Sequence, residues 1–187
     1  KMTVGDEIQV LKGTYKESLT FFKDVVISGS SRRDTTIEGT IFIPENMKVI
    51  ISNLTIKPST QLFIEGEVTF IDVNLDGKNV NSILCVNKGK LKTINCSITN
   101  SNDLGIAALN KSNIELKETV FVNNNKAHIL VENSSVRVSN CTFEQSQHAI
   151  WIKKNSKVNS GTNTFKYQQG TQIIIQNNSE FYDNSST

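Results

Sequence analysis

The sequence is poor in the features that mark several common protein classes. It has two prolines, one tryptophan and three cysteines among 187 residues. No segment approaches the roughly 20 consecutive apolar residues of a membrane-spanning helix, and the first residues lack the charged-then-apolar pattern of a signal peptide. Lys and Arg number 20 against 18 Asp and Glu, without a clustered basic stripe. Neither a membrane span nor a nucleic-acid partner is therefore expected.

A repeat runs through most of the chain. Its segments begin with an apolar residue and are 21 to 23 residues apart, starting at Ile41, Leu62, Ile83, Ile106, Ile129, Ile150 and Ile173. This period, with several short strands in each unit, fits a solenoid in which every coil pairs with its neighbours. We predict an all-β fold, a right-handed parallel β-helix of about seven to eight coils, with the handedness taken from the general rule for parallel crossovers.

The domain organisation follows from length and spacing. Residues 1–187 are expected to form a single β-helix domain, because this length suits one buried core and no linker interrupts it. Residues 1–40 follow the repeat with looser spacing, whereas 41–187 form regular coils. The chain opens without an evident start and stops partway through a repeat, which fits a domain excised from a larger protein.

A polar residue recurs in the second half of each segment. In six of the seven segments it is asparagine, at Asn53, Asn74, Asn95, Asn140, Asn163 and Asn184. Asparagine tolerates a left-handed backbone, and its amide can donate to one neighbour and accept from another. The pattern predicts an inward-facing structural Asn ladder at a corner between strands. The Asn-x-Ser/Thr sequons at Asn53, Asn95 and Asn140 would then be buried.

The second residue of each segment should point outward, yet it is apolar throughout. This predicted stripe consists of Phe42, Phe63, Leu84, Ala107, Leu130, Trp151 and Ile174. An exposed apolar row of this length is uncommon on a soluble monomer and is typical of an interface or groove. We interpret it as a binding surface for a protein or a sugar, or as a face covered by another part of the same protein.

The three cysteines are interpreted as buried core residues. Cys96 and Cys141 share an inward row, but the coil carrying Thr119 separates them by about 9.6 Å, too far for a disulfide. Cys85 is assigned to a different inward row. Free thiols and buried sequons favour a cytoplasmic location over the cell surface or secretion.

The residues Gly5-Asp6, Gly13-Thr14-Tyr15, Gly29 and Thr36-Ile37-Glu38-Gly39 resemble the opening of many pectin-lyase-like β-helices. The resemblance is to the repeats of periplasmic copper-assembly and carbohydrate-binding families and covers nearly the whole chain. It implies a fold, and a fold does not imply a function. In the enzymes of this superfamily the outer face of the first sheet carries paired acids or a calcium site. Here it carries Phe, Leu, Ala and Trp.

The remaining candidates for catalysis lie near one edge in successive coils. They are Asp103, His128 and His148, close to Lys126. We expect no cofactor and no metal site, and favour a non-catalytic recognition or scaffolding module that docks a protein partner or a neighbouring domain through the stripe. Alternatives are a carbohydrate-binding module on the same groove and a polysaccharide lyase or hydrolase with an atypical site.

Overall fold

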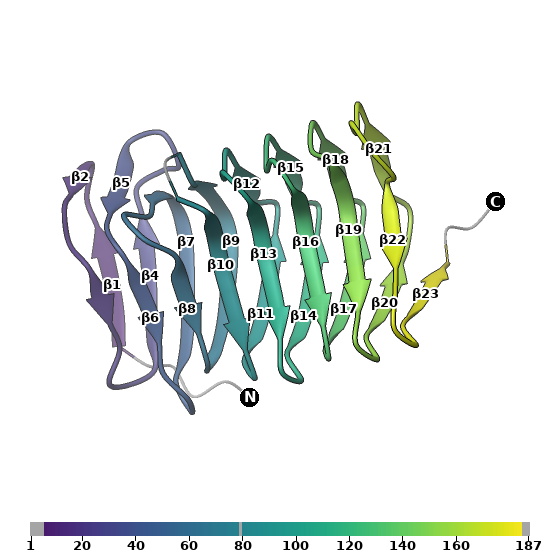
Figure 1. The fold of residues 1–187 in the computed structure, drawn as a ribbon. Coiled ribbons are helices and arrows are strands. Elements are labelled where there is room, and N and C mark those ends of the chain that lie inside the picture. Colours follow the sequence, from purple (N-terminus) through teal and green to yellow (C-terminus); the bar gives the residue numbers. More distant parts are fainter. Residues whose placement is uncertain (1–5, 79, 185–187) are drawn as a thin grey trace.

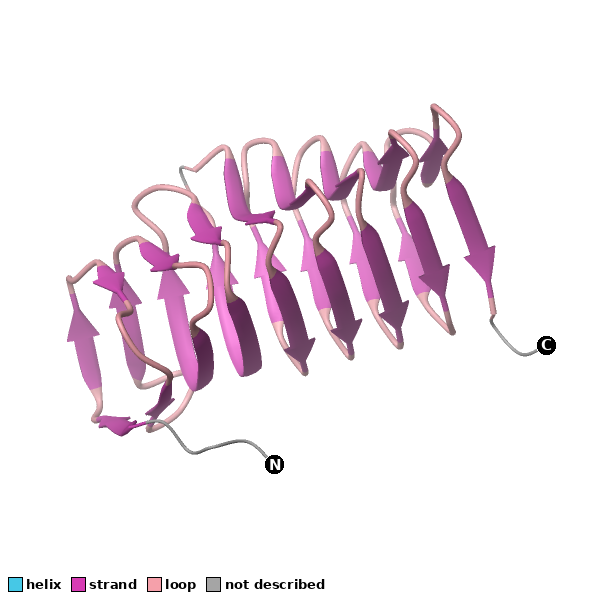
Figure 2. Cartoon of the chain, turned by 90° about the horizontal axis from the view of Figure 1, so that it is seen from below, coloured by secondary structure: helices cyan, strands magenta, loops and turns pink. Residues whose placement is uncertain are grey.

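The computed structural model describes residues 6–78 and 80–184, so Gly5 of the opening motif lies outside the described residues. Every regular element in this part of the chain is a β-strand (Figure 2). The coils stack along one axis from the first to the last, and each coil pairs in parallel with the next (Figure 1). The predicted right-handed parallel β-helix is confirmed, with eight coils represented in its eight-stranded sheet.

The strands of successive coils form three faces. The eight-stranded sheet consists of β3 (Leu19–Thr20), β6 (Ile41–Ile43), β8 (Leu62–Ile64), β10 (Ser82–Asn87), β13 (Leu104–Leu109), β16 (Ala127–Glu132), β19 (His148–Lys153) and β22 (Ile173–Ile175). The second face consists of β1 (Asp6–Val10), β4 (Val25–Gly29), the first halves of β7 (Lys48–Lys57) and β9 (Glu67–Asp76), β11 (Lys90–Ile94), β14 (Asn113–Lys117), β17 (Ser135–Ser139), β20 (Lys157–Ser160) and β23 (Glu180–Asp183). The third consists of β2 (Gly13–Tyr15), β5 (Thr35–Glu38), the second halves of β7 and β9, β12 (Ser97–Thr99), β15 (Val120–Val122), β18 (Thr142–Glu144) and β21 (Thr164–Lys166).

Alternate residues of each strand point inward and form rows along the axis. One such row on the third face contains Phe121, Phe143 and Phe165, whose rings stack with centroids 5.0 and 5.1 Å apart. Each fully buried Ile, Leu or Phe side chain contributes about 1.5–3 kcal/mol of transfer free energy. Because every inner coil buries such residues against both neighbours, the core is one continuous column.

The corner between the second and third faces uses a left-handed backbone, as predicted, but the predicted ladder is wrong. The residues at this corner with positive φ are Asn53, Asp72, Asn95, Glu118 and Asn140. The asparagines of this row are exposed, not inward. The side chain of Asn95 donates to Asp72, so neutral amides alternate with carboxylates along the row.

The other predicted ladder residues lie elsewhere. Asn74 is on extended backbone in β9, Asn163 continues the inward cysteine row, and Asn184 is exposed in the last coil. Asn53, Asn95 and Asn140 therefore also expose the sequons that were expected to be buried. One of the two grounds for a cytoplasmic location is removed, and the location stays a prediction.

A serine ladder, which the sequence interpretation missed, lies at the corner after the eight-stranded sheet. The backbone N–H of Ser112 donates to Ser134 Oγ at 3.1 Å, Ser134 N–H to Ser156 Oγ at 3.2 Å, and Ser156 N–H to Ser179 Oγ at 3.2 Å. Ser112, Ser134 and Ser156 are buried, so each of these three bonds satisfies a backbone N–H that water cannot reach. The interior ladder of this β-helix is therefore built from serine.

The cysteine prediction is confirmed for two residues and corrected for one. Cys96, Thr119 and Cys141 share an inward row in successive coils, and all three cysteines are free and buried. Burial raises the pKa of the Cys141 thiol to about 11 and also raises that of Cys96. Cys85 does not point inward, because it pairs in register with the outward Phe63.

Candidate functional site

The outer face of the eight-stranded sheet carries the predicted apolar stripe with one residue changed. The register places Phe42, Phe63, Cys85, Ala107, Leu130, Trp151 and Ile174 in one outward row. Leu84, predicted to belong to this row, instead pairs with Leu62 and Ile106 and is fully buried in the core. Ile83 and Leu84 are both apolar and adjacent, so their hydrophobicity alone does not fix which of them begins the inward alternation.

The stripe is exposed in its first part. Phe42 and Phe63 are paired in adjacent coils, and the Phe63 side chain is 42% exposed. Phe22, two residues after the partner of Phe42, is 87% exposed, although it was not among the predicted stripe residues. These three rings, which we call the Phe patch, place aromatic surface in water, and burying each against a partner would be favourable.

The middle of the row has small side chains and exposes little surface. Cys85 and Ala107 are small, and their exposures are 8% and 6% although both point outward. Burial, with the negative charge of Glu65 as a smaller cause, raises the pKa of the Cys85 thiol. This thiol is therefore protonated at neutral pH and is not an activated nucleophile.

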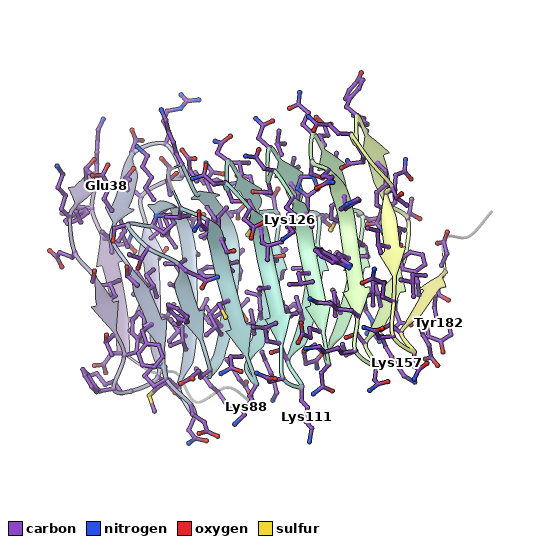
Figure 3. All side chains as sticks on the ribbon, viewed as in Figure 1. Glu38, Lys88, Lys111, Lys126, Lys157 and Tyr182 are labelled. Carbon is purple, nitrogen blue, oxygen red and sulfur yellow. The ribbon has the colours of Figure 1, made fainter. Side chains whose placement is uncertain are left out.

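The later part of the stripe is covered by its own side chains. Leu109, Leu130 and Trp151 pack over Leu104, Ala107 and Ala127 and form a second apolar cluster outside the sheet. The ammonium groups of Lys126 and Lys153 lie 5.4 and 5.0 Å from the Trp151 ring centroid. Lys126 projects from the loop edge of this face (Figure 3). Trp151 also donates from Nε1 to Gln176 Oε1 at 3.1 Å, so its ring is held on several sides.

The charged residues beside Trp151 are already engaged. Glu132 forms ion pairs with Lys153 at 3.2 Å and with Lys154. Hydrogen bonding from Lys154, with a further contribution from Lys153, lowers the pKa of the Glu132 carboxyl. Glu132 is thus held as an anion, and it is not poised to give up a proton near neutrality.

His128 lies inside the core and not at the predicted edge. It is fully buried and packs against the rings of Phe121 and Phe143. Asn124 accepts from Ser101 through Oδ1 and donates to His128 Nδ1 at 2.9 Å through Nδ2, so Nδ1 is the acceptor and the proton is on Nε2.

Burial lowers the pKa of His128 to about 3, and the Glu144 carbonyl offsets this shift only in part. Nε2 lacks a partner of good hydrogen-bond geometry among the described residues. The ring is thus neutral at physiological pH. It cannot serve as a surface acid or base, and the edge position expected for the weak candidate His128 is wrong.

Asp103 and His148 stay near the surface but do not form a catalytic group with His128. Asp103 pairs with Lys126 at 3.7 Å. His148 lies in an outward row with Leu104 and Ala127, and its Nδ1 donates to the Thr171 carbonyl at 2.8 Å. The structure therefore brings Asp103 to Lys126, as the sequence suggested, and places His128 on the opposite side of the sheet.

The carboxylates on this face are widely spaced. Glu65 and Glu132 occupy one outward row with Asn87 and Leu109 between them, which separates their backbones by about 14 Å at one strand spacing per coil. Paired glycosidase carboxyls lie about 5–9.5 Å apart. Among residues 6–78 and 80–184, no three His, Cys, Asp or Glu residues cluster closely enough to hold a metal. No helix in the described chain could span a bilayer.

Comparison with known proteins gives the family. A model described as the right-handed beta helix region matches residues 15–186. The chain belongs to this right-handed β-helix family. The resemblance to pectin-lyase-like proteins is thereby confirmed for the fold, and the β-helix shares it with proteins of different activities.

Other comparisons add little about activity. No curated protein matches the β-helix significantly. Among solved structures it is similar to the A-module of mannuronan C-5 epimerase AlgE4 from Azotobacter vinelandii, with 9% identity, a TM-score of 0.24, and coverage of 98% of this chain and 91% of that one. A likeness this distant says nothing about what the present face binds.

Proposed function

We propose that this β-helix is a non-catalytic recognition module that docks a protein partner or a neighbouring domain through the first part of its stripe. The observation that carries the proposal is the Phe patch, which combines exposed Phe22 with Phe42 and Phe63 from the first part of the stripe, outside the cluster around Trp151. Buried aromatic anchors commonly supply a large share of the affinity of protein interfaces.

The chemistry of the face supports binding over catalysis. Its carboxylates are separated or ion-paired, His128 is neutral within the core, and the Cys85 thiol is protonated. The face thus offers apolar area and fixed charges, which suit recognition, and lacks a nucleophile beside a base. A sugar stacking on Trp151 would compete with Lys126 and Lys153 for the same ring.

The test begins with site-specific crosslinking. A benzophenone amino acid is placed at Phe63, and at Arg137 on the second face as a control, in cells that express the full-length protein. A defined protein or domain crosslinked from position 63 and not from 137 is then purified. It is titrated against wild type and Phe63→Ser, for which we expect at least a tenfold loss of affinity, about 1.4 kcal/mol.

Other outcomes separate the alternatives. Equal affinity of wild type and Phe63→Ser for the purified partner would rule out the Phe patch as its docking site. Retarded migration in gels containing a polysaccharide, lost in Phe63→Ser, would assign the same face to carbohydrate. Cleavage of a polysaccharide that Asp103→Asn or His148→Ala abolishes would contradict the non-catalytic proposal.

A further inference from the structure

Positive charge is concentrated on the second face and on the corner that leads into it from the eight-stranded sheet. In four consecutive coils this surface consists of residues 88–94, 110–117, 133–139 and 154–160, which contain eight basic residues and one acidic residue. Its net charge is +7, whereas that of the whole chain is +2. The eight basic residues, which we call the basic patch, are Lys88, Lys90, Lys92, Lys111, Lys117, Arg137, Lys154 and Lys157.

The fold assembles the basic patch from residues that are far apart in the sequence. Its members on the strands occupy outward positions, and seven of the eight basic residues are exposed, with Lys92 half-buried. At one strand spacing per coil and about 3.3 Å per residue, the patch spans about 14 Å along the axis and about 20 Å across it. Lys88, Lys111 and Lys157 lie along one edge of the molecule (Figure 3). The sequence shows no basic run, because the contributing segments are one coil apart.

Three patch residues occupy the corner itself on left-handed backbone. The φ angles of Lys88, Lys111 and Lys154 are 60°, 72° and 55°. Asparagine holds most of the non-glycine left-handed positions in the described chain, because its short side chain can form local hydrogen bonds there, whereas the conformation is unfavourable for longer side chains. The bend alone therefore favours asparagine, and the lysines indicate a use for exposed ammonium groups along this corner.

Several patch residues are available to an external anion. Within the described chain, the side chains of Lys88, Lys111 and Arg137 form no hydrogen bond or ion pair. Glu115, the acid within the patch, pairs with Lys92 at 3.2 Å, and Arg137 follows it in the same outward row. The remaining patch lysines pair with acids at the rim of the patch, and exposed pairs of this kind contribute little and are screened by salt.

The shape of the basic patch favours a planar anionic partner. The patch covers four neighbouring outward rows, so a linear chain would follow only part of it, whereas the headgroup layer of a bilayer can contact every row. None of the four segments contains an aromatic residue on which nucleic-acid bases could stack. A depression of about 330 Å³ within the patch is lined by residues that include Lys90, Lys92 and Arg137. The guanidinium of Arg137 can bind a phosphate there through two N–H donors.

We propose that the basic patch docks the β-helix onto the surface of a bilayer that contains anionic phospholipids. The eight positive charges would face the headgroup layer together, and each basic residue near such a surface raises partitioning about fivefold. Binding should weaken steeply with ionic strength, because charges are screened beyond about 10 Å at 0.1 M salt and beyond about 3 Å at 1 M. This contact uses a different face from the Phe patch and does not depend on the docking of a protein partner there.

Cosedimentation with vesicles tests the proposal. Wild type should bind vesicles of phosphatidylcholine that contain phosphatidylserine, should not bind vesicles of phosphatidylcholine alone, and should be released by high salt. Lys88→Gln/Lys111→Gln/Arg137→Gln removes the three charges that lack partners in the described chain. The partition coefficient of this patch variant should be at least tenfold lower than that of wild type.

The matched control removes the same charge from the third face and its corner. Lys16→Gln/Lys57→Gln/Lys166→Gln also lowers the net charge by three, so binding that depended only on overall charge would weaken equally in both variants. The control should bind like wild type, and circular dichroism establishes that both variants are folded. Phe63→Ser, in the Phe patch, should also bind like wild type.

Three results would overturn the proposal. The first is the absence of binding to phosphatidylserine vesicles at low salt; retention on immobilised polyglutamate or on a single-stranded oligonucleotide would then assign the patch to a soluble polyanion. The second is a folded patch variant that binds no more weakly than the control. The third is a loss of vesicle binding in Phe63→Ser, which would place the membrane contact on the Phe patch.

Discussion

Between about pH 3 and 6.5, the unfolded chain binds a proton at His128 that the folded chain does not. Burial lowers the folded pKa to about 3, whereas the ordinary value is 6.5. The unfolded state therefore takes up more protons in this window, and the free energy of unfolding must fall as the pH falls. Above pH 6.5 both states hold a neutral ring, and His128 contributes no pH dependence.

We expect His128 to make the protein acid-sensitive, by about 1.4 kcal/mol per pH unit well below pH 6.5. Urea unfolding of wild type and His128→Gln from pH 8 to pH 4 measures this slope. Glutamine offers Asn124 an acceptor without a titrating ring. In this variant the free energy of unfolding should therefore depend less steeply on pH, by the contribution of one proton. The stability difference between the two proteins should be constant above pH 7. Identical slopes below pH 6 would show that His128 is not held neutral by the fold.

Asn95 and Asn74 allow the corrected corner to be tested at single residues. Asn95 has φ of 52°, whereas Asn74 is on extended backbone in β9. A β-branched residue is strained in the left-handed region, so Asn95→Val should lower the free energy of unfolding by about 1–2 kcal/mol. Asn95→Gly should be better tolerated, and Asn74→Val should cost less than Asn95→Val. Chemical denaturation measures the loss of stability in each variant. A larger loss in Asn74→Val than in Asn95→Val would contradict the assignment of the left-handed corner to Asn95.

Trp151 reports on the covered part of the stripe because it is the only tryptophan. Its ring is half-buried and lies near the ammonium groups of Lys126 and Lys153. Because Asp103 and Glu132 pair with these two lysines, the charges around the ring nearly cancel in wild type. Lys126→Ala/Lys153→Ala removes both positive charges and keeps the two carboxylates, so the ratio of quenching by the anion iodide to quenching by caesium should fall. An unchanged ratio would mean that the two lysines do not lie beside the ring.

At the scale of the corner, the serine ladder links consecutive coils through backbone donors. Ser134 Oγ accepts from the Ser112 N–H and donates to the Glu132 carbonyl at 2.9 Å. Ser134→Ala should leave the buried Ser112 N–H with only its longer bond to the Leu109 carbonyl at 3.3 Å, and should lower the free energy of unfolding by about 1 kcal/mol. Ser135→Ala, at the adjacent exposed position, is the control and should change stability little. Similar unfolding midpoints for the two variants would contradict the structural role of the ladder.

The strands were predictable because period and apolar alternation report burial directly. Corners were harder to predict, since Asn favours both left-handed bends and ladder bonds, and only the register distinguishes exposed Asn95 from Asn74 in β9. The stripe was assigned correctly except at Leu84, where adjacent apolar residues leave the alternation of inward and outward side chains undetermined. His128 could not be placed from its type, because its position depends on how closely its backbone approaches Gly105 in the preceding coil. A Cβ there would lie 2.6 Å from the His128 carbonyl oxygen and 3.1 Å from Asn124 Nδ2.

At the scale of the molecule, the strands of each coil pair only with the coil before it and the coil after it. Strands pair along the axis in a fixed sequence, so stability is approximately a sum of coil and interface contributions. Asn113 and Ser135 are paired equivalents in consecutive coils. Deletion of residues 113–134 therefore removes one complete coil and joins Ser112 to Ser135 at the matching point of the next. The shortened chain should fold with similar β-sheet circular dichroism and lower thermal stability.

This deletion also tests the row that contains the cysteines. In the native chain Thr119 lies between Cys96 and Cys141, whereas the shortened chain would place the two thiols in adjacent coils, about 4.8 Å apart along the axis. That spacing falls within the Cα range of disulfides, about 4.4–6.8 Å. Because burial raises the pKa of Cys141 to about 11, the thiolate is scarce in the folded state, and oxidation is carried out during refolding.

We expect thiol titration of the refolded deletion variant to count one free thiol, that of Cys85, and mass spectrometry to find Cys96 linked to Cys141. Full-length protein treated identically should retain all three thiols, and the deletion variant with Cys141→Ser should retain two. A folded deletion variant in which Cys96 and Cys141 stay reduced would show that removing the coil does not bring its neighbours into register. Failure of the shortened chain to fold would instead mean that the coils are not interchangeable units.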